Sequence, residues 1–265
     1  MSARFADVLV VLRGGGDLAT GAGWRLKRSG FPLVVCELER PLTVRRSVAF
    51  STAVDEGEAI VEGVRAVRAT LADARALAAT AVVPVLVSPG LPPLEASVVV
   101  DARMAKHALD TTIDDAPLVV ALGPGYTAGV DCQAVVETKR GAQLGRVLWS
   151  GAAAENTGTP GRIVGHAAER VLRAPATGAI HWRTEIGRTV AAGTVLGDVE
   201  QSAGTAPFDG LVRGLIAEGT PVSRGLKIGD VDPRTDTDWR QISDKALAIG
   251  GGVLEAVLTW LSGRG

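Results

Sequence analysis

The 265-residue sequence is poor in cysteine and in aromatic residues, and charges of the two signs almost cancel. Its two cysteines, Cys36 and Cys132, are too few for a disulfide framework and form no Cys-x-x-Cys pair, which favours a reducing, cytoplasmic compartment. A net charge of −1 lacks the basic field that non-specific binding to nucleic acid or to an acidic membrane requires. We therefore expect neither nucleic acid nor a membrane among its partners.

Long apolar runs and metal-ligand clusters are also missing. The apolar run from Val8 to Leu12 is too short for the core of a signal peptide and is followed at once by Arg13 and glycines. No segment offers the ~18 uncharged apolar residues that span a membrane. His107, His166 and His181 have no second histidine or cysteine at metal-ligand spacing. The sequence therefore predicts a soluble cytoplasmic protein without a metal site.

The first part of the chain alternates apolar runs with helical spacing, a pattern typical of an α/β sheet. Residues 7–12 form a β-rich run that ends at three glycines, residues 18–26 repeat apolar side chains at helical spacing, and residues 33–36 form a second buried strand. Further apolar runs end in polar or Gly/Pro-rich turns, as parallel strands do at their carboxyl ends: 82–87, 98–101 and 118–122. We predict a Rossmann-like open parallel sheet with a β excursion near its end.

The first glycine turn has the form of a dinucleotide-binding fingerprint, Gly-x-Gly-x-x-Ala, between a strand and a helix. Its glycines allow a phosphate to approach the helix N-terminus, where free N–H groups favour anions. Glu37 lies 21 positions after Gly16, where a ribose-binding acid is expected, although the charge of Asp17 would stand beside a pyrophosphate. The residues predicted for this cradle are Gly14, Gly16, Asp17, Ala19, Thr20, Gly21 and Glu37.

A second glycine turn, Gly123-Pro124-Gly125, follows another apolar strand and predicts a second nest for an anion. Arg140 and Arg146 in the next segment are expected to neutralise a phosphate on the ligand. The alternative for each glycine turn is a role in packing, and for each arginine a solvated charge. No nucleophile elbow, P-loop or catalytic triad pattern occurs, so no catalytic residue is predicted and enzymatic activity stays open.

Residues 171–232 contain an internal repeat with an offset of 32 positions. Ala174-Pro175 recurs as Ala206-Pro207, and a Gly-x-x-Val-x-x-Gly-x-x-x-Gly-Asp-Val string begins both at Gly187 and at Gly219. Two copies are too few for a solenoid, so we expect one closed two-fold barrel. The repeat resembles the biotinyl/lipoyl barrel-sandwich family, in which a joining hairpin displays a lysine that receives biotin or lipoate. The joining segment 200–205 has no lysine, so we expect no covalent biotin or lipoate.

After the repeat, the sequence predicts one C-terminal helix from Ser243, whose hydroxyl can cap it, to about Leu261. Glycines 250–252 in its interior would cost roughly 1 kcal/mol each relative to alanine. Either the helix breaks there or another backbone packs closely against it. The predicted organisation is an α/β domain over residues 1–165, a lysine-free barrel over 166–235, and a C-terminal helix over 236–265 that packs on the α/β domain.

Several strings of the chain carry a resemblance to one family. They are Arg13 to Gly21, Glu37 to Pro41 with Arg45-Arg46, Asp101 to Lys106, Gly123 to Gly125, Glu137-Thr138 with Arg140-Gly141 and Leu144 to Arg146, Asn156 to Gly158 with Pro160-Gly161, Lys227 to Arg234 and Ile242 to Lys245. Together they resemble the selenium-dependent molybdenum hydroxylase system protein family over nearly the whole chain. The sequence departs from the family at Ala142, where a histidine is expected.

The resemblance implies an accessory protein for maturation of a molybdenum-containing hydroxylase, with the hydroxylase apoenzyme as its partner. The first glycine turn would bind a nucleotide or a molybdopterin-type cofactor, and NAD(P) is the other candidate. Two further functions stay open: an NAD(P)-dependent oxidoreductase, and a non-catalytic scaffold that docks a hydroxylase. An oxidoreductase would need an acid or base near the nicotinamide, and the sequence positions none. Formation of a homo-oligomer also stays open.

Overall fold

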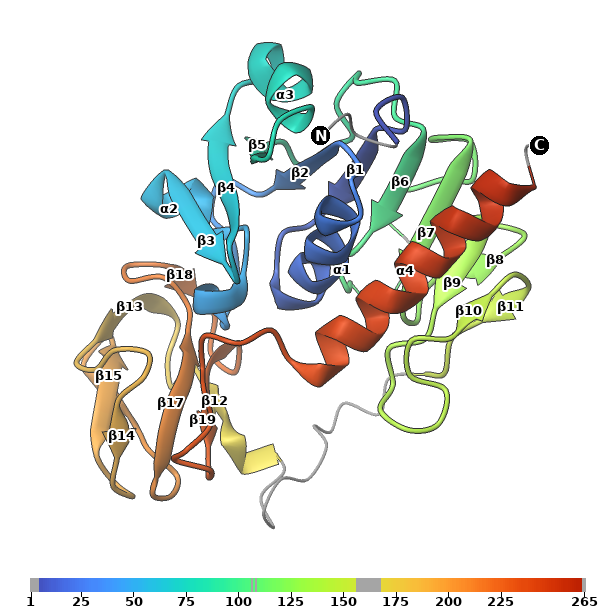
Figure 1. Ribbon diagram of the computed structural model, residues 1–265. Coiled ribbons are helices and arrows are strands. Elements are labelled where there is room, and N and C mark those ends of the chain that lie inside the picture. Colours follow the sequence, from blue (N-terminus) through green and yellow to red (C-terminus); the bar gives the residue numbers. More distant parts are fainter. Residues whose placement is uncertain (1–4, 106, 108, 156–167, 264–265) are drawn as a thin grey trace. The chain divides into compact units, whose positions relative to one another are not determined.

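A computed structural model describes residues 5–105, 107, 109–155 and 168–263 (Figure 1). The chain divides into two compact units. Unit 1 comprises Met1–Glu39, Ala49–Thr157 and Ile242–Gly265, and unit 2 comprises Arg40–Val48 and Gly158–Gln241. Unit 1 holds a large mixed sheet with helices and unit 2 consists mainly of strands, so the predicted α/β class with a C-terminal helix is confirmed.

The sheet of unit 1 has nine strands in the order β10-β9-β7-β6-β1-β2-β5-β4-β3. Seven are parallel, but each edge strand is antiparallel to its neighbour, so the predicted all-parallel sheet is corrected to a mixed one. A two-residue turn with positive φ at Glu62 and Gly63 forces this pairing for β3 and β4, because so short a loop joins only antiparallel strands. The strands are β1 (Val10–Arg13), β2 (Leu33–Glu37), β3 (Glu58–Val61), β4 (Val64–Ala69), β5 (Val83–Val87), β6 (Val98–Asp101), β7 (Leu118–Leu122), β9 (Ala134–Val136) and β10 (Val147–Leu148).

The direction in which the chain adds strands reverses at β1. From β1 the chain adds β2, β3, β4 and β5 on one side, and it then returns to add β6, β7 and β9 on the other side. Connections from neighbouring strands β1 and β6 therefore leave the sheet in opposite directions. In open α/β sheets, ligands bind outside the carboxyl ends of the strands at such a reversal.

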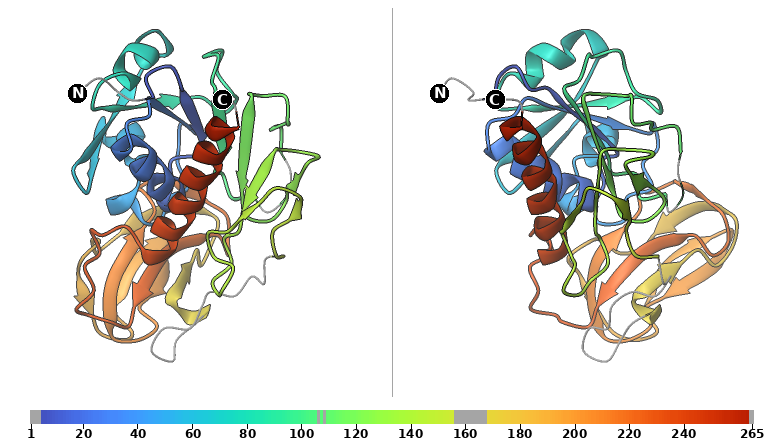
Figure 2. Two further views of the ribbon diagram at one scale, coloured as in Figure 1. Left: turned by 45° about the vertical axis from the view of Figure 1, so that its right-hand side comes forward. Right: turned by 90° about the vertical axis from the view of Figure 1, so that its right-hand side faces the viewer.

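Two long helices of unit 1 pack against each other, α1 (Asp17–Arg28) and α4 (Asp244–Ser262) (Figures 1 and 2). The Ser243 hydroxyl caps α4 by accepting a hydrogen bond from the Ala246 N–H at 3.1 Å, as predicted. By length and composition alone α4 could cross a membrane. This helix packs on α1, β7 and β9, and its buried residues include Ile249, Val253 and Val257. The remaining elements of unit 1 are α2 (Thr52–Glu56), α3 (Leu71–Ala78), β8 (Thr127–Ala128) and β11 (Gly151–Ala152).

Unit 2 has two four-stranded sheets, ordered β12-β19-β17-β14 and β16-β15-β13-β18. Strands β12, β13, β14 and β15 of the first copy correspond, 32 positions later, to β16, β17, β18 and β19 of the second copy. Each sheet contains two strands from each copy, and corresponding strands occupy equivalent positions in the two sheets. The elements are η1 (Arg46–Val48), η2 (Ala168–Arg170), β12 (Val171–Arg173), β13 (Gly178–Trp182), β14 (Thr189–Val190), β15 (Val195–Val199), β16 (Ser202–Thr205), β17 (Gly210–Leu215), β18 (Pro221–Val222) and β19 (Lys227–Asp232).

Candidate functional site

The candidate site lies where the chain leaves β1 and β6. The register pairs Arg13, the last residue of β1, with Asp101, the last residue of β6. Gly14 follows with φ of +99°, and a Cβ there would lie 3.2 Å from the carbonyl group of Ala102. The first glycine of the fingerprint is thus required because the loop after β6 approaches the backbone closely. Met104 in the same loop has φ of +57°. This conformation is uncommon for residues other than glycine, and it occurs most often at functional sites.

Glu37, the predicted ribose ligand, closes the first glycine turn. Its carboxylate accepts the Gly15 N–H at 2.8 Å and the Leu38 N–H at 2.7 Å. Burial raises the pKa of Glu37, although these two hydrogen bonds act in the opposite sense. One backbone donor of the turn is therefore already satisfied by the chain. A contact between Glu37 and a ligand stays a prediction.

The other residues of the predicted cradle divide into two groups. Gly16 is the N-cap of α1, no side chain caps this helix end, and Asp17 lies in the first turn. Ala19, Thr20 and Gly21 are buried. The Thr20 hydroxyl accepts the Phe50 N–H at 2.9 Å, and Gly21 packs on the backbone of Ala246 in α4. The structure thus places Gly14, Gly16 and Asp17 at the turn, and the three buried residues in the packing behind it.

Other segments of the chain pack closely against the two glycines of the second predicted nest. Gly123 and Gly125 have φ of +72° and +113°. A Cβ would lie 2.5 Å from the Thr138 hydroxyl at the first position and 2.7 Å from the His107 backbone at the second. The backbone of Ala102 therefore lies close to Gly14, and the backbone of His107 lies close to Gly125.

The two predicted phosphate-binding arginines lie on the exposed segment after β9. Arg140 forms a two-pronged ion pair with Asp244, at 2.6 and 2.9 Å. Arg146 donates to the Ala142 carbonyl at 3.3 Å. A phosphate contact for either arginine stays a prediction.

Lys106, the loop Asn156–Gly161 and His166 were also singled out, and all lie outside the described residues, as does the domain boundary at residue 165. His181 is exposed and lies 3.0 Å from Glu218. Within the described part of the chain, no group of three or more His, Cys, Asp or Glu side chains is arranged to hold a metal ion.

A buried charge network at the ends of β1 and β6 was not predicted. The Asp101 carboxylate accepts hydrogen bonds from Arg103 at 2.5 Å, from Thr111 at 2.6 Å and from Tyr126 at 2.7 Å. Arg13, only 2% exposed, donates to the Thr111 hydroxyl and to the Asp110 carboxylate, both at 2.6 Å. Charged residues ending two buried strands were a visible signal, but their partners lie on loops that the sequence did not connect with them.

The network keeps its carboxylates ionised. Burial alone would raise the pKa of Asp101, but hydrogen bonds from Arg103, Thr111 and Tyr126 outweigh it and hold that pKa below its usual value. The hydrogen bond from Arg13 lowers the pKa of Asp110 strongly. Asp101 and Asp110 are therefore both negative at neutral pH, and they offset the charges of the two arginines.

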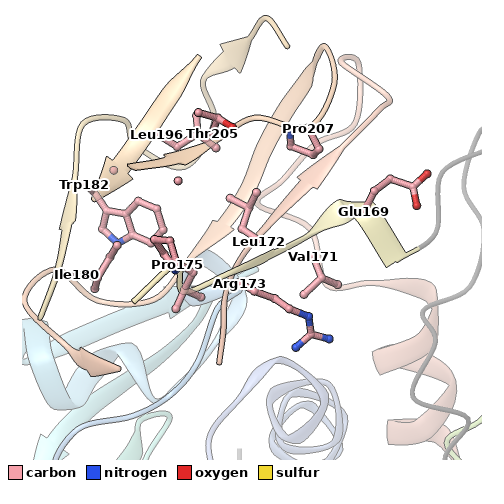
Figure 3. Close-up of a pocket in the computed structure, with 13 residues that line it drawn as sticks. Glu169, Val171, Leu172, Arg173, Pro175, Ile180, Trp182, Leu196, Thr205 and Pro207 are labelled. Atoms are coloured by element: carbon pink, nitrogen blue, oxygen red, sulfur yellow. The ribbon is translucent and has the colours of Figure 1, made fainter. Parts of the chain in front are cut away.

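A cavity of about 180 Å³ lies between the two sheets of unit 2 (Figure 3). Its wall is largely apolar and includes Leu172, Ile180, Trp182 and Leu196. Figure 3 shows the charged group of Arg173 directed away from Trp182 and Leu196. Apart from the charged side chains of Glu169 and Arg173, the lining is mostly apolar, and we place the candidate site in unit 1, where several charged groups contact one another.

A scan against protein-family models finds no match. A search of curated proteins finds the uncharacterized protein YqeB of Escherichia coli (strain K12), 49% identical over 255 residues. The alignment covers 94% of this chain and 47% of YqeB, so the chain spans about half the length of the curated relative it matches.

Two solved structures were also found. The succinylglutamate desuccinylase/aspartoacylase of Rhodobacter sphaeroides is 26% identical over 24% of this chain and 22% of that chain, with a TM-score of 0.22. An aspartoacylase family protein of Mesorhizobium loti is 12% identical over 86% of this chain and 85% of that chain, with a TM-score of 0.30. These scores are too low to carry an argument about the fold or the activity of this chain.

The comparisons overturn the predicted family. None of the proteins found is described as a selenium-dependent molybdenum hydroxylase system protein, and YqeB is described without a function. We withdraw the maturation function, the selenium dependence, the oxidoreductase and scaffold alternatives, and the hydroxylase apoenzyme as partner. The resemblance relied on short glycine and charge strings, and packing accounts for several of these, including Gly14, Gly21, Gly123 and Gly125.

Both cysteines are expected to resist alkylation in the folded protein. Burial raises the pKa of Cys36 to about 12 and that of Cys132 to about 11, so the reactive thiolate is scarce. We expect iodoacetamide at pH 8 to label both thiols only after unfolding, as measured by mass spectrometry. Because the folded pKa values are raised, the stability that the neutral thiols contribute is present below about pH 8.5 and is lost as the pH rises towards 11 and 12. Rapid labelling of the native protein would contradict their burial.

Proposed function

We propose that the protein binds a small anionic molecule at the carboxyl ends of β1 and β6. The observation that carries this proposal is the reversal of strand order at β1, with an uncapped helix N-terminus and the Arg13 network at the same point. A helix N-terminus presents free N–H groups and a partial positive charge to an anion. Arginine adds a planar donor fork that suits carboxylate and phosphate groups.

We infer that Gly14, Gly16 and Asp17 form the part of the site nearest α1, with Glu37 beside them. The contacts of Glu37 support a narrow role for it: its carboxylate orients the glycine turn through the Gly15 N–H. Gly123, Gly125, Arg140 and Arg146 form the outer part of the proposed site. Ala19, Thr20 and Gly21 support it through packing.

We further infer a Rossmann-like fold for unit 1 and a lysine-free biotinyl/lipoyl-like barrel for unit 2. The strand order around β1 supports the first inference. The exchange of strands between two sheets supports the second, as does the hairpin of β15 and β16, which turns at Glu200 and Gln201 with positive φ. The division of the chain at residues 165 and 235, and a cytoplasmic location, remain predictions.

Calorimetric titration with pyrophosphate, inorganic phosphate and malonate tests the binding proposal. Gly16 has φ of −66°, so valine is tolerated there by the backbone, but its side chain would crowd the α1 N-terminus. We expect an anion to bind the natural protein and to bind the Gly16→Val variant at least about tenfold more weakly, a loss of ~1.4 kcal/mol.

Gly90→Val is the matched control, because a Cβ at Gly90 meets nothing within 4 Å and this glycine lies in the loop after β5. We expect this variant to bind as the natural protein does. Absence of binding for all three anions would overturn the proposed function. Equal binding by the Gly16→Val variant would remove α1 from the site.

A further inference from the structure

We propose that Asp110 occupies an anion subsite formed by Arg13 and Arg103, and that a carboxylate of the ligand displaces it. This inference rests on the proposed function and names the chemical group that the site receives. Two guanidinium groups from different segments converge on the Asp110 carboxylate, one on each oxygen. Arg13 donates to Oδ2 and Arg103 to Oδ1, both at 2.6 Å.

Burial distinguishes the two sides of this contact. The Arg13 side chain is 2% exposed and that of Arg103 is 20% exposed, whereas that of Asp110 is 60% exposed. The cationic side is therefore fixed within the protein, and the anionic side can leave by rotation of a surface side chain. Each guanidinium group also donates a hydrogen bond to a second partner, Arg13 to the Thr111 hydroxyl and Arg103 to the Asp101 carboxylate. The donors stay oriented when the Asp110 carboxylate moves away.

The balance of charge indicates the class of anion. Arg13 and Arg103 are opposed by Asp101 and Asp110, and Asp115 lies 3.9 Å from Arg13. A ligand carboxylate that replaces Asp110 leaves this balance unchanged. A phosphate dianion in its place adds one negative charge near the carboxylates of Asp101 and Asp115, which are buried and partly buried. The same two oxygens can accept the same two donors. The subsite is therefore better suited to a carboxylate than to a phosphate dianion.

A purely structural role for Asp110 is the competing explanation, because a buried arginine needs a partner. If the role of Asp110 is purely structural, no site for an external carboxylate is accessible at Arg13 and Arg103. The two accounts differ in what small carboxylates do to a variant without this side chain. Only a vacated and accessible subsite takes up an external carboxylate.

Calorimetric titration of malonate and acetate into Asp110→Ala tests the proposal. An internal carboxylate that fills the subsite nine-tenths of the time weakens an external competitor about tenfold, so we expect affinity for malonate to increase at least about tenfold in this variant. Added acetate is also expected to raise the unfolding temperature of Asp110→Ala more than that of the natural protein. Asp114→Ala removes the same charge from an exposed position in the same loop and is expected to change neither quantity.

A second variant tests the donors. Arg103→Gln in the Asp110→Ala background removes one of the two forks, so the gain in malonate affinity should disappear. The subsite would be overturned if Asp110→Ala bound malonate as the natural protein does and gained no additional thermal stability from acetate. A greater gain in affinity for inorganic phosphate than for malonate would overturn the preference for a carboxylate. Anion binding that depends on Gly16 but not on Asp110 would leave the proposed function standing without the subsite. A gain in Asp110→Ala that Gly16→Val leaves unaltered would support the subsite without the α1 cradle.

Discussion

Replacing Gly250 or Gly252 in α4 with alanine is expected to destabilise the protein by about 1–3 kcal/mol, although alanine favours helices. A Cβ at Gly250 would lie 2.5 Å from the carbonyl oxygen of Gly21 in α1. A Cβ at Gly252 would overlap the carbonyl oxygen of Gly145. Both neighbours are backbone atoms, which cannot rotate away as a side chain can, so the two segments would have to separate.

Gly251 is the matched control because it belongs to the same helical turn. A Cβ there meets nothing within 4 Å, so Gly251→Ala is expected to stabilise the protein by about 1 kcal/mol through helix propensity. Urea unfolding followed by circular dichroism measures all three variants, and a constant slope would show that the extent of unfolding is unchanged. Stabilisation by alanine at all three positions would contradict the close packing of α4.

These glycines also show how far the sequence predicts the fold. It predicted a C-terminal helix capped by Ser243, and it predicted that three interior glycines require either a break or a close backbone neighbour. The helix is continuous and the neighbours are Gly21 and Gly145. Helix periodicity and capping are local properties of a segment, whereas the contact with residues more than a hundred positions away depends on how the sheet is ordered.

The candidate site was predictable to a similar extent. The Gly-x-Gly-x-x-Ala string correctly indicated a strand, a turn and a helix, because glycines in such a turn are demanded by backbone geometry. The same geometry arises whether a phosphate or another part of the chain approaches the turn. At Gly14 the approaching group is the backbone of Ala102, and Glu37 takes the N–H of Gly15. A motif of spacing alone cannot separate these two causes.

The Arg13 network could not be predicted because no local pattern links its members. Arg13 and Asp101 become neighbours through the pairing of β1 with β6. Thr111 and Tyr126 then reach Asp101 from loops whose path no periodicity specifies. A charged residue at the end of a buried strand is a signal that a partner is needed, but only the register identifies that partner.

Asp101→Ala is expected to destabilise the protein by about 3–5 kcal/mol, because it leaves charged Arg103 and two hydroxyl groups without their common acceptor. Tyr126→Phe removes one donor from the same carboxylate and retains the ring, so its expected cost is only about 1 kcal/mol. Urea unfolding at pH 7 measures both. Equal costs for the two variants would show that the carboxylate is not the centre of the network.

The pH dependence separates the charge of Asp101 from its shape. Its pKa is lowered in the folded state, so the stability it contributes is present above the unfolded value of about 3.9 and is lost as the pH falls through the folded value. Asp101→Asn keeps the size of the side chain and removes this titration. We therefore expect the difference in unfolding free energy between the natural protein and Asp101→Asn to be largest near pH 7 and to shrink below pH 4. A difference that stays constant between pH 7 and pH 3 would mean that packing at this position, rather than the ion pair with Arg103, stabilises the ends of β1 and β6.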